Sequence, residues 1–423
     1  MWLWPTFAVG TSHMIVTAAL TPLIPLYAVA RGASPTMVGF IAASAAVLPL
    51  ALGVWTGVAA DVLGSRRMSI AGSLILAAST ALMAAAPTIG LLMVGTAIGG
   101  LANNVLILGN QTAVARGSRS EDRDQNFGFF TFAVSIGQLV GPVVGGFLAD
   151  ASSIETALFA FAGLALVPGV LALGLEPPAP QGAAADPAAS VLRPNNAYRA
   201  AWSLVGRPEL RFVLWIAFVI IFAWSIKSSF YPLYLKSVGI SNARIGLIFA
   251  FLGAGSMIVR PLVGAIAGRY GSRQVLLGAV VLASLAIGIT PFLMEFFPLA
   301  LAAGVTGMAW GFTQPLTMSL MAGSVAPHER GLALSLRMTS NRLAEVISPI
   351  VFGGLVAWSG LRSSFFLSAA ALGVGIWVIS RGTAASAPGA TVREQSGTEG
   401  PRPAYPEIAA PRAPSSPAPS DRG

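Results

Sequence analysis

The sequence predicts an all-α membrane protein whose twelve transmembrane helices form two pseudo-symmetric six-helix bundles. Three observations lead to this fold class. Apolar residues make up 55% of the chain and charged residues only 10%, whereas soluble domains are roughly one quarter charged. The apolar residues gather in runs of about 20 or more, the length at which a helix crosses ~30 Å of hydrocarbon. The second half of the chain also repeats features of the first half at a constant spacing.

Each predicted span is an apolar run bounded by glycine, proline or charged residues. The spans of the first half lie near residues 5–28, 35–60, 66–86, 88–114, 125–149 and 154–175. Those of the second half lie near residues 210–235, 242–267, 274–293, 296–321, 331–357 and 362–381. The first run has no basic segment before it and is longer than the apolar core of a signal peptide, so we expect it to be retained as a span.

Composition divides the chain into four parts. Residues 1–175 and 208–381 are the two six-helix bundles, and residues 176–207 between them form an Ala/Pro-rich cytoplasmic linker. Residues 382–423 are rich in Pro, Ala and Ser without an apolar period, which predicts a disordered cytoplasmic tail.

Positive charge gathers on one side of the predicted bundle. The loops of that side carry Arg66, Arg67, Arg116, Arg119, Arg123, Arg193, Arg199, Arg207, Arg269, Arg273 and Arg330. The opposite loops carry only Arg31, Lys236, Arg244 and Arg362. By the positive-inside rule the arginine-rich side is cytoplasmic. We therefore expect a multi-pass protein of the cytoplasmic (inner) membrane with both termini in the cytoplasm. The net charge of +9 therefore indicates topology, and we see no basic patch for nucleic acid.

An ungapped offset of 207 residues relates the two halves. The triplet Pro25-Leu26-Tyr27 matches Pro232-Leu233-Tyr234. Further matches pair Gly39 with Gly246, Gly57 with Gly264, Gly64 with Gly271, Arg66 with Arg273, Pro142 with Pro349, and Gly146 with Gly353. Because the matches cluster at hinges and helix breaks, they indicate two parallel halves with a solute site between them.

Two stretches resemble sequence motifs of a known family. The loop between spans 2 and 3 reads Gly57-x-x-Ala60-Asp61-x-x-Gly64-x-Arg66-Arg67, and span 5 contains Gly137-x-x-x-Gly141-Pro142-x-x-Gly145-Gly146. The first is similar to the signature loop of the major facilitator superfamily, and the second to the antiporter motif of its efflux branch. Over residues 5–381 the chain resembles this superfamily. The resemblance implies a secondary transporter that works by alternating access.

The signature loop implies a gate on the cytoplasmic side. In the family its acid is thought to contact the start of span 11, which here lies near Arg330-Gly331, and a carboxylate is favourable at a helix N-terminus. The predicted gating residues are Gly57, Asp61, Gly64, Arg66, Arg67, Gly264, Arg260, Arg269, Gly271 and Arg273. The alternative is that the arginines only anchor the topology and that Gly141-Pro142 makes a static kink.

Polar side chains inside spans are candidates for the solute path, since they are costly in hydrocarbon. In span 7, Trp224, Lys227 and Tyr231 share a face at i, i+3 and i+7. Spans 1, 4, 7 and 10 line the central path in the family. The substrate-path candidates are Asn103, Asn104, Trp224, Lys227, Tyr231, Trp310, Gln314 and Asn341.

Span 11 carries the deepest acid, and it has a basic neighbour. Arg342 and Glu345 stand at i and i+3 and can pair. Either this is a structural ion pair, or Glu345 is a protonatable coupling residue. The family's drug–proton exporters usually carry an arginine in span 4 where Gly95 and Thr96 stand here, and spans 1 and 4 contain no acid. Glu345 is therefore the candidate left for ion coupling, with Arg342 as its partner.

These observations predict a secondary transporter that exports a small organic solute in exchange for protons. The alternatives are solute uptake by symport or uniport and, more distantly, a non-transporting receptor or scaffold. With two histidines and no cysteine, the chain lacks the residues for a metal or acid/base cluster, so we expect neither an enzyme nor a cofactor, a metal or a catalytic residue. No P-loop is present. The expected partners are the solute, protons and the lipid bilayer, and the protein is expected to be a monomer.

Overall fold

A computed structural model describes residues 3–119, 122–175, 205–325 and 330–382. The described residues all belong to one compact unit, Met1–Gly382. In them every regular element is helical. Eleven helical segments are long and apolar enough to cross a membrane, and Leu361–Trp377 adds a shorter apolar helix as the twelfth. The predicted all-α membrane fold is confirmed, whereas most of the predicted linker and tail lies outside the described residues.

The first half contains the six predicted spans in six helices. They are α1 (Leu3–Ala30), α2 (Pro35–Ala84), α3 (Ile89–Gly117), α4 (Arg123–Ala151), α5 (Ile154–Leu164) and α6 (Val167–Ala172). Helix α2 includes spans 2 and 3, which join at a kink where Gly64 has a φ of 72°. Helices α5 and α6 together make span 6.

The second half is more interrupted. It contains α9 (Pro208–Ser229), α10 (Tyr231–Ser237), α11 (Asn242–Val259), η1 (Arg260–Leu262), α12 (Val263–Tyr270), α13 (Ser272–Ile289), η2 (Thr290–Phe292), α14 (Phe296–Gly323), α15 (Arg330–Ser359) and α16 (Leu361–Gly382). Span 8 is broken into α11, η1 and α12 at Pro261, which has no N–H for the helical ladder.

Paired glycines mark the two ends of the helical assembly. Gly32 and Gly239 have φ of 82° and 86°, and Gly64 and Gly271 have φ of 72° and 84°. Each pair is related by the 207-residue offset, and only glycine adopts positive φ without strain. The turns of the repeat are therefore alike in both halves. We call the two ends of the helices the Gly32 end and the Gly64 end.

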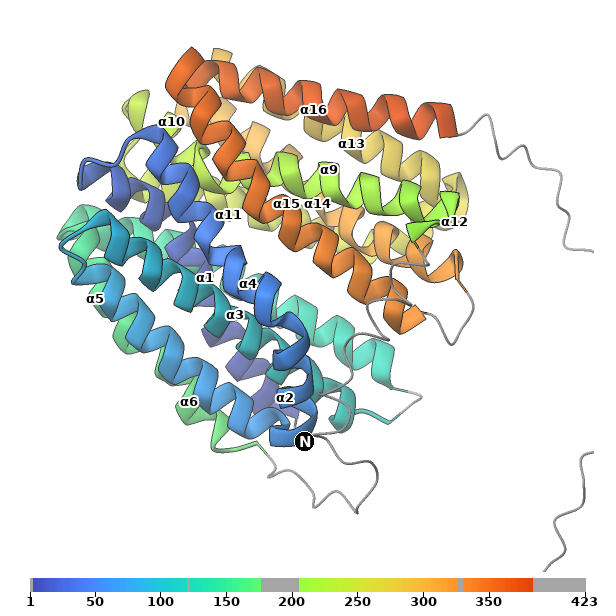
Figure 1. The fold of residues 1–423 in the computed structure, drawn as a ribbon, viewed down its shortest axis with the longest axis horizontal. Helices are drawn as coiled ribbons and strands as arrows, with labels where there is room; N and C mark the ends of the chain where they lie inside the picture. The colour runs from blue at the N-terminus through green and yellow to red at the C-terminus, as the bar shows by residue number, and fades with distance from the viewer. Residues whose placement is uncertain (1–2, 120–121, 176–204, 326–329, 383–423) are drawn as a thin grey trace, which may run out of the picture. The chain divides into compact units, whose positions relative to one another are not determined.

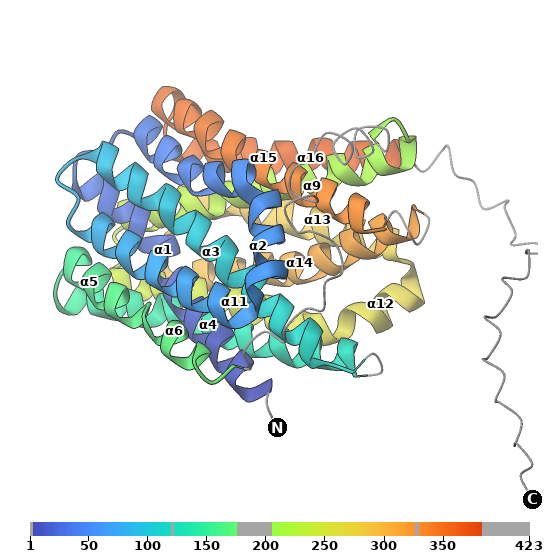
Figure 2. The ribbon, with the colours of Figure 1, turned by 60° about the horizontal axis from the view of Figure 1, so that its bottom comes forward.

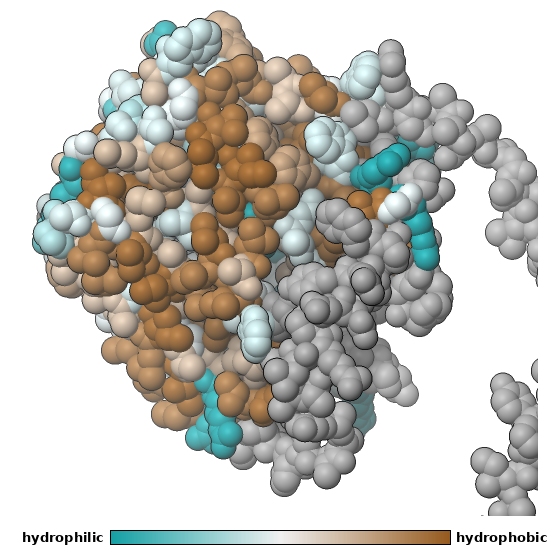
Figure 3. Space-filling model, viewed as in Figure 1, coloured by the Kyte–Doolittle hydropathy of each residue, from teal (hydrophilic) through white to brown (hydrophobic). Residues whose placement is uncertain are grey.

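The halves join through two helix pairs. Helix α2 packs against α15, and α4 packs against α11; Figures 1 and 2 show residues 3–175 (blue to green) beside residues 205–382 (green to red). The outward faces are apolar, with Phe292, Phe297 and Trp358 each at least 70% exposed. Figure 3 shows apolar residues over much of the described part of one face. Such a surface suits lipid rather than water.

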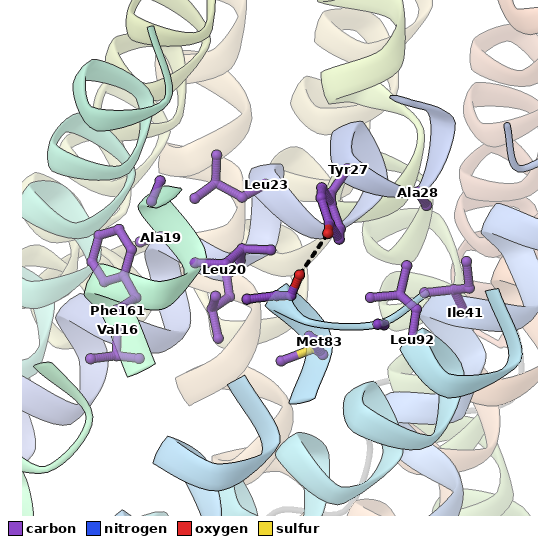
Figure 4. Close-up of a cluster of buried hydrophobic side chains, with 14 of the residues drawn as sticks. Val16, Ala19, Leu20, Leu23, Tyr27, Ala28, Ile41, Met83, Leu92 and Phe161 are labelled. Carbon is purple, nitrogen blue, oxygen red and sulfur yellow. Dashed lines mark hydrogen bonds between the residues drawn. The ribbon is translucent and has the colours of Figure 1, made fainter. Parts of the chain in front are cut away.

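The buried core differs between the two ends. At the Gly32 end one cluster mixes the halves, because Phe230, Phe352 and Val356 pack with residues of α1 to α5. Figure 4 shows the first-half part of this cluster, where the Tyr27 hydroxyl donates to the Ala84 carbonyl at 2.8 Å. Toward the Gly64 end the described clusters each draw on one half only. The halves are thus held together mainly at the Gly32 end.

Candidate functional site

A cavity of about 410 Å³ lies between the two halves. Its walls come from α1, α2, α3 and α4 on one side and from α9, α11, α14 and α15 on the other. A more apolar hollow of about 220 Å³ adjoins it, lined by α1, α2 and α3 and by Ser228 and Ser229 of α9, and it shares Thr17, Thr21 and Asn103 with the cavity. A cavity of a few hundred Å³ accepts a small organic molecule.

The wall from the first half consists mostly of small side chains and carries no charge. Thr17, Thr21, Asn103 and Gln138 supply its polar groups. His13 is buried behind this wall, and its Nε2 forms a 2.9 Å hydrogen bond with Asn103 Oδ1. This bond fixes the orientation of the Asn103 amide, which presents its remaining hydrogen-bonding capacity to the cavity.

The wall from the second half is aromatic and charged. Trp224 of α9 and Trp310 of α14 stack with their ring centroids 4.1 Å apart and their planes 18° from parallel. Both line the cavity, and Phe249 of α11 adds a third ring. Stacked indoles offer a flat apolar surface on which an aromatic or cationic solute can pack.

An ion pair on α15 connects this wall to the first half. Arg342 Nη1 donates to Glu345 Oε2 at 2.7 Å, and both residues line the cavity. Arg342 Nη2 also lies 3.4 Å from Asn104 Oδ1 of α3, and Asn104 Nδ2 donates to Thr56 Oγ1 at 2.9 Å. Because Arg342 contacts both halves, a change in the charge of Glu345 would be felt across the cavity.

Five predicted path residues do not line this cavity, and the first of them, Asn104, contacts its wall through Arg342. Lys227 is 2% exposed and points into the second half, where its Nζ donates to Thr306 Oγ1 at 2.7 Å and lies 4.8 Å from the centre of the Tyr231 ring. Tyr231 is buried with it. Gln314 and Asn341 line a separate hollow of about 10 Å³. The prediction that these five residues line the central cavity therefore differs from the structure.

The reason is the choice of helix face. Residues advance by about 100° per position in an α-helix, so Trp224 could belong to a face with Lys227 or to one with Ser228. The cavity-facing residues of α9 are Trp224, Ser225, Ser228 and Ser229. The polar Ser228, four positions after Trp224, is the sequence feature that could have indicated the cavity-facing side of α9. Met14, Gln138, Phe249 and Ser256 also line the cavity without having been predicted.

The glycine-rich stretch of α4 has two faces. A Cβ placed on Gly137, Gly141 or Gly145 would meet α1 at 2.6, 2.3 or 3.1 Å. Gly146 instead faces the other half, since its Cβ would lie 2.3 Å from the Asn242 carbonyl oxygen at the start of α11. The first face packs the first half tightly, and the second brings α4 onto α11.

Two equivalent crossings close the cavity at the Gly32 end. A Cβ on Gly246 would lie 2.1 Å from the Pro142 carbonyl oxygen, and a Cβ on Gly39 would lie 2.2 Å from that of Pro349. The offset of 207 turns one contact into the other. Gly353 likewise approaches the Pro35 carbonyl, as Gly146 approaches that of Asn242. Pro142 and Pro349 also line the cavity, so these backbone contacts form its closed end.

The predicted gating residues at the Gly64 end are more loosely packed. Gly57 and Gly264 have open space where a Cβ would stand. Gly64 and Gly271 make the positive-φ turns, Arg66 and Arg273 are half-buried, and Arg67 is exposed. Arg269 lies 5.5 Å from the Tyr270 ring centre. The Asp61 and Arg330 side chains lie outside the described residues, so their predicted contact stays a prediction.

Arg260, another predicted gating residue, reaches the other half. It begins η1, and its Nη1 donates to Ser135 Oγ of α4 at 2.6 Å. Ser135 is buried one turn before the cavity-lining Gln138. This bond joins α4 to the broken span 8 on the Gly64 side of the glycine crossings.

Comparisons with known proteins agree with this architecture. A family model described as Major Facilitator Superfamily matches residues 6–293 and 213–415. Multidrug resistance protein MdtG of Rahnella sp. (strain Y9602) is 30% identical over 168 residues, 38% of this chain and 40% of MdtG. Quinolone resistance protein NorA of Staphylococcus aureus (strain MRSA252) is 27% identical over 131 residues, 31% of this chain and 34% of NorA. The matched stretches thus span less than half of either relative.

Solved transporter structures share the fold. The nucleoside transporter NupG superposes with a TM-score of 0.75 at 16% identity, covering 90% of this chain and 98% of NupG. A bacterial homolog of the human lysosomal transporter Spinster, in an inward-facing and occupied conformation, superposes with a TM-score of 0.74 at 13% identity, covering 90% and 96%. At these identities the likeness shows the fold alone.

Proposed function

Because this chain belongs to the Major Facilitator Superfamily and is a multi-pass membrane transporter, we propose that it exports a small organic solute in exchange for protons. The observation that carries the proposal is the pair of equivalent glycine crossings, which close a central cavity at one end. Halves that meet through equivalent contacts can rock about the cavity and meet at the other end instead. Alternating access follows from that exchange of contacts.

The direction of export rests on sidedness. The Gly64 end carries most of the loop arginines, so we assign it to the cytoplasm and the Gly32 end to the outside. The described conformation then corresponds to an inward-facing state that would take up solute from the cytoplasm. The likeness of the α4 glycine stretch to the antiporter motif, together with the efflux relatives MdtG and NorA, favours export over uptake.

Solute binding would use both walls. The stacked Trp224 and Trp310 would hold an aromatic or apolar body, and Asn103, fixed by His13, would hydrogen-bond to its polar groups. The adjoining hollow among α1, α2 and α3 would admit larger solutes. A cavity with a flat apolar platform and few polar groups suits a range of related molecules better than one fixed solute.

Proton coupling would use the ion pair on α15. The ionised Glu345 would offer its carboxylate to a cationic group of the solute, and protonation would remove that charge while Arg342 keeps its contact with Asn104. Among the residues that the structure describes, Glu345 is the one carboxylate on the cavity wall. Proton and solute would thereby compete for the same local charge, which is the requirement for exchange.

The Gly64 end would close in the opposite state. We propose that Asp61 then meets the positive N-terminus of α15 near Arg330, where a carboxylate is favourable. Gly57 and Gly264, which have free space in the described state, would allow close approach of the opposite half. Arg66, Arg67, Arg269 and Arg273 would keep this end in the cytoplasm.

The test measures norfloxacin, a fluorescent quinolone, and ethidium in bacteria that lack their own drug exporters. Cells that produce the protein should accumulate less of at least one probe, and a protonophore should restore accumulation to the level of cells carrying an empty vector. Greater accumulation in producing cells would support uptake. Equal accumulation of both probes, with the protein present in the membrane, would count against drug export.

A further inference from the structure

One carboxylate at the Gly32 end crosses between the halves. Asp150 is the next-to-last residue of α4, and its two oxygens accept from the backbone N–H groups of Asn242 and Ala243 at 3.1 and 2.8 Å. Those residues are the first two of α11. The side chain of one half therefore caps a helix of the other half.

This contact is favourable for three reasons. The first N–H groups of a helix have no partner within the helix, and Asp150 supplies two of them with acceptors. Its negative charge faces the positive end of the α11 dipole, and hydrogen bonds to an ionised acceptor are stronger than neutral ones. The Ser241 hydroxyl already accepts from the Arg244 N–H, so Asp150 adds to an ordinary helix cap and does not replace it.

The approach of the two helices is prepared by glycine. Gly146 lies one turn before Asp150, and a Cβ there would lie 2.3 Å from the Asn242 carbonyl oxygen. Lys236 Nζ donates to Asn242 Oδ1 at 3.1 Å, which steadies the start of α11 from its own half. Close packing by Gly146 thus brings the Asp150 carboxylate within reach of the α11 terminus.

The equivalent crossing has no such carboxylate. The 207-residue offset relates Asp150 to Ala357 of α15, which carries no polar group. The helix that α15 meets is α2, which begins at Pro35 and so offers no N–H at its first position. One of two otherwise matched crossings is therefore held by charge as well as by packing.

We propose that Asp150 is a gating residue of the transporter, which holds the Gly32 end shut and must leave the α11 terminus before that end can open. This role rests on the proposed alternation of access. The predicted gating residues lie on the opposite, Gly64 side of the cavity. Asp150 adds a helix-capping charge at the Gly32 end, on one of the two crossings.

The test measures a distance across the Gly32 end in the purified full-length protein. The chain has no cysteine, so Thr156→Cys and Ser237→Cys, one exposed site in each half, give the two attachment points for nitroxide labels. In this background Asp150→Asn keeps the size of the side chain and removes its charge. We expect the population with the longer label distance, relative to the population with the shorter one, to rise about tenfold, which is equivalent to ~1.4 kcal/mol.

We call the contact of Asp150 with the start of α11 the latch. A matched control distinguishes loss of the latch from a general loss of negative charge at the Gly32 end. Glu155 lies at the same end and pairs with Arg31 at 3.0 Å within its own half. Glu155→Gln should leave the distance distribution unchanged. Asp150→Ser, whose hydroxyl can still cap α11 without charge, should shift the ratio in the same direction as Asp150→Asn and serves if the latter fails to fold.

The proposal is overturned if folded Asp150→Asn or Asp150→Ser gives the distance distribution of the parent, or if Glu155→Gln shifts it equally. The readout does not depend on transport. A parent protein that exports no probe but still shows the Asp150-specific shift would reject the proposed export and keep the latch.

Discussion

The Gly32 end and the Gly64 end carry matched glycines but differ in how the halves meet. At the Gly32 end, Gly39 and Gly246 press against the backbone of the opposite half, whereas Gly57 and Gly264 near the other end have free space around them. The 207-residue offset pairs Gly39 with Gly246 and Gly57 with Gly264. The two halves therefore make one matched pair of close contacts at the Gly32 end and leave one matched pair of open positions near the Gly64 end.

Replacing a glycine at one of the crossings by a large residue should have the largest effect, because it should open the Gly32 end. Gly246→Leu would place side-chain atoms on the Pro142 carbonyl, which cannot move without displacing α4. We expect the closed Gly32 end to lose about 3 kcal/mol, the upper part of the range for overpacking, and its population to fall about a hundredfold. The label distance between positions 156 and 237 measures this.

Gly264→Leu is the matched control, because the same change falls in open space. It should not raise the population of the longer distance. Gly39→Leu should behave like Gly246→Leu, as the repeat relates their contacts. Unequal effects of Gly39→Leu and Gly246→Leu would show that the two crossings do not act as equivalents.

A change on the cavity wall should affect transport without altering which end is closed. Glu345→Gln removes the carboxylate that pairs with Arg342 at 2.7 Å. We expect proton-driven export to fall at least about tenfold, while exchange of solute without a proton gradient persists. Export rates in proteoliposomes with and without a pH gradient test this. Full proton-driven export by the variant would assign the pair a structural role.

The aromatic platform should determine solute affinity more than conformation. Trp224→Leu removes one ring of the stacked pair, and aromatic pairs contribute about 0.5–1.5 kcal/mol beyond buried area. We expect the KM for an aromatic solute to rise about three- to tenfold. Trp215→Leu is the control, because Trp215 is on the same helix but 44% exposed and away from the cavity. Equal effects of both variants would remove the platform from the site.

The smallest effect is expected for alanine at the open end. Gly57→Ala meets nothing within 4 Å, and alanine is favoured over glycine within a helix by about 0.5–1 kcal/mol. Thermal unfolding should therefore show slightly higher stability. If Gly57 packs against the opposite half in the other state, the export rate should fall despite that gain. A variant that exports normally would show that this glycine is not needed for closure.

Sequence alone predicted what the repeat encodes. The hinges at Gly64 and Gly271 and the equivalence of Pro142 with Pro349 follow from one offset, because hinges and helix breaks require particular residue types. The structure adds that both glycines have positive φ. The spans followed from apolar length. These features are local, so a single sequence contains the information.

The features that depend on neighbouring helices could not be predicted. Lys227 shares a possible helix face with Trp224, but its side chain points to Thr306 of α14, and helical spacing alone does not decide between adjacent faces. The sequence also does not show which end of the cavity is closed, since glycines stand at both ends. The sequence does not single out Asp150, because the backbone groups of the other half that it contacts are marked by no residue type.

The two cavity prolines have one more consequence. Proline has no N–H, so Pro142 and Pro349 leave the carbonyls of Gln138 and Glu345, four residues earlier, without their usual helical donor. Those two residues are themselves repeat equivalents, and both line the cavity. Each half therefore places a main-chain acceptor that lacks its helical donor at a residue of the cavity wall, and no exchange of the side chains at positions 138 and 345 would take these acceptors away.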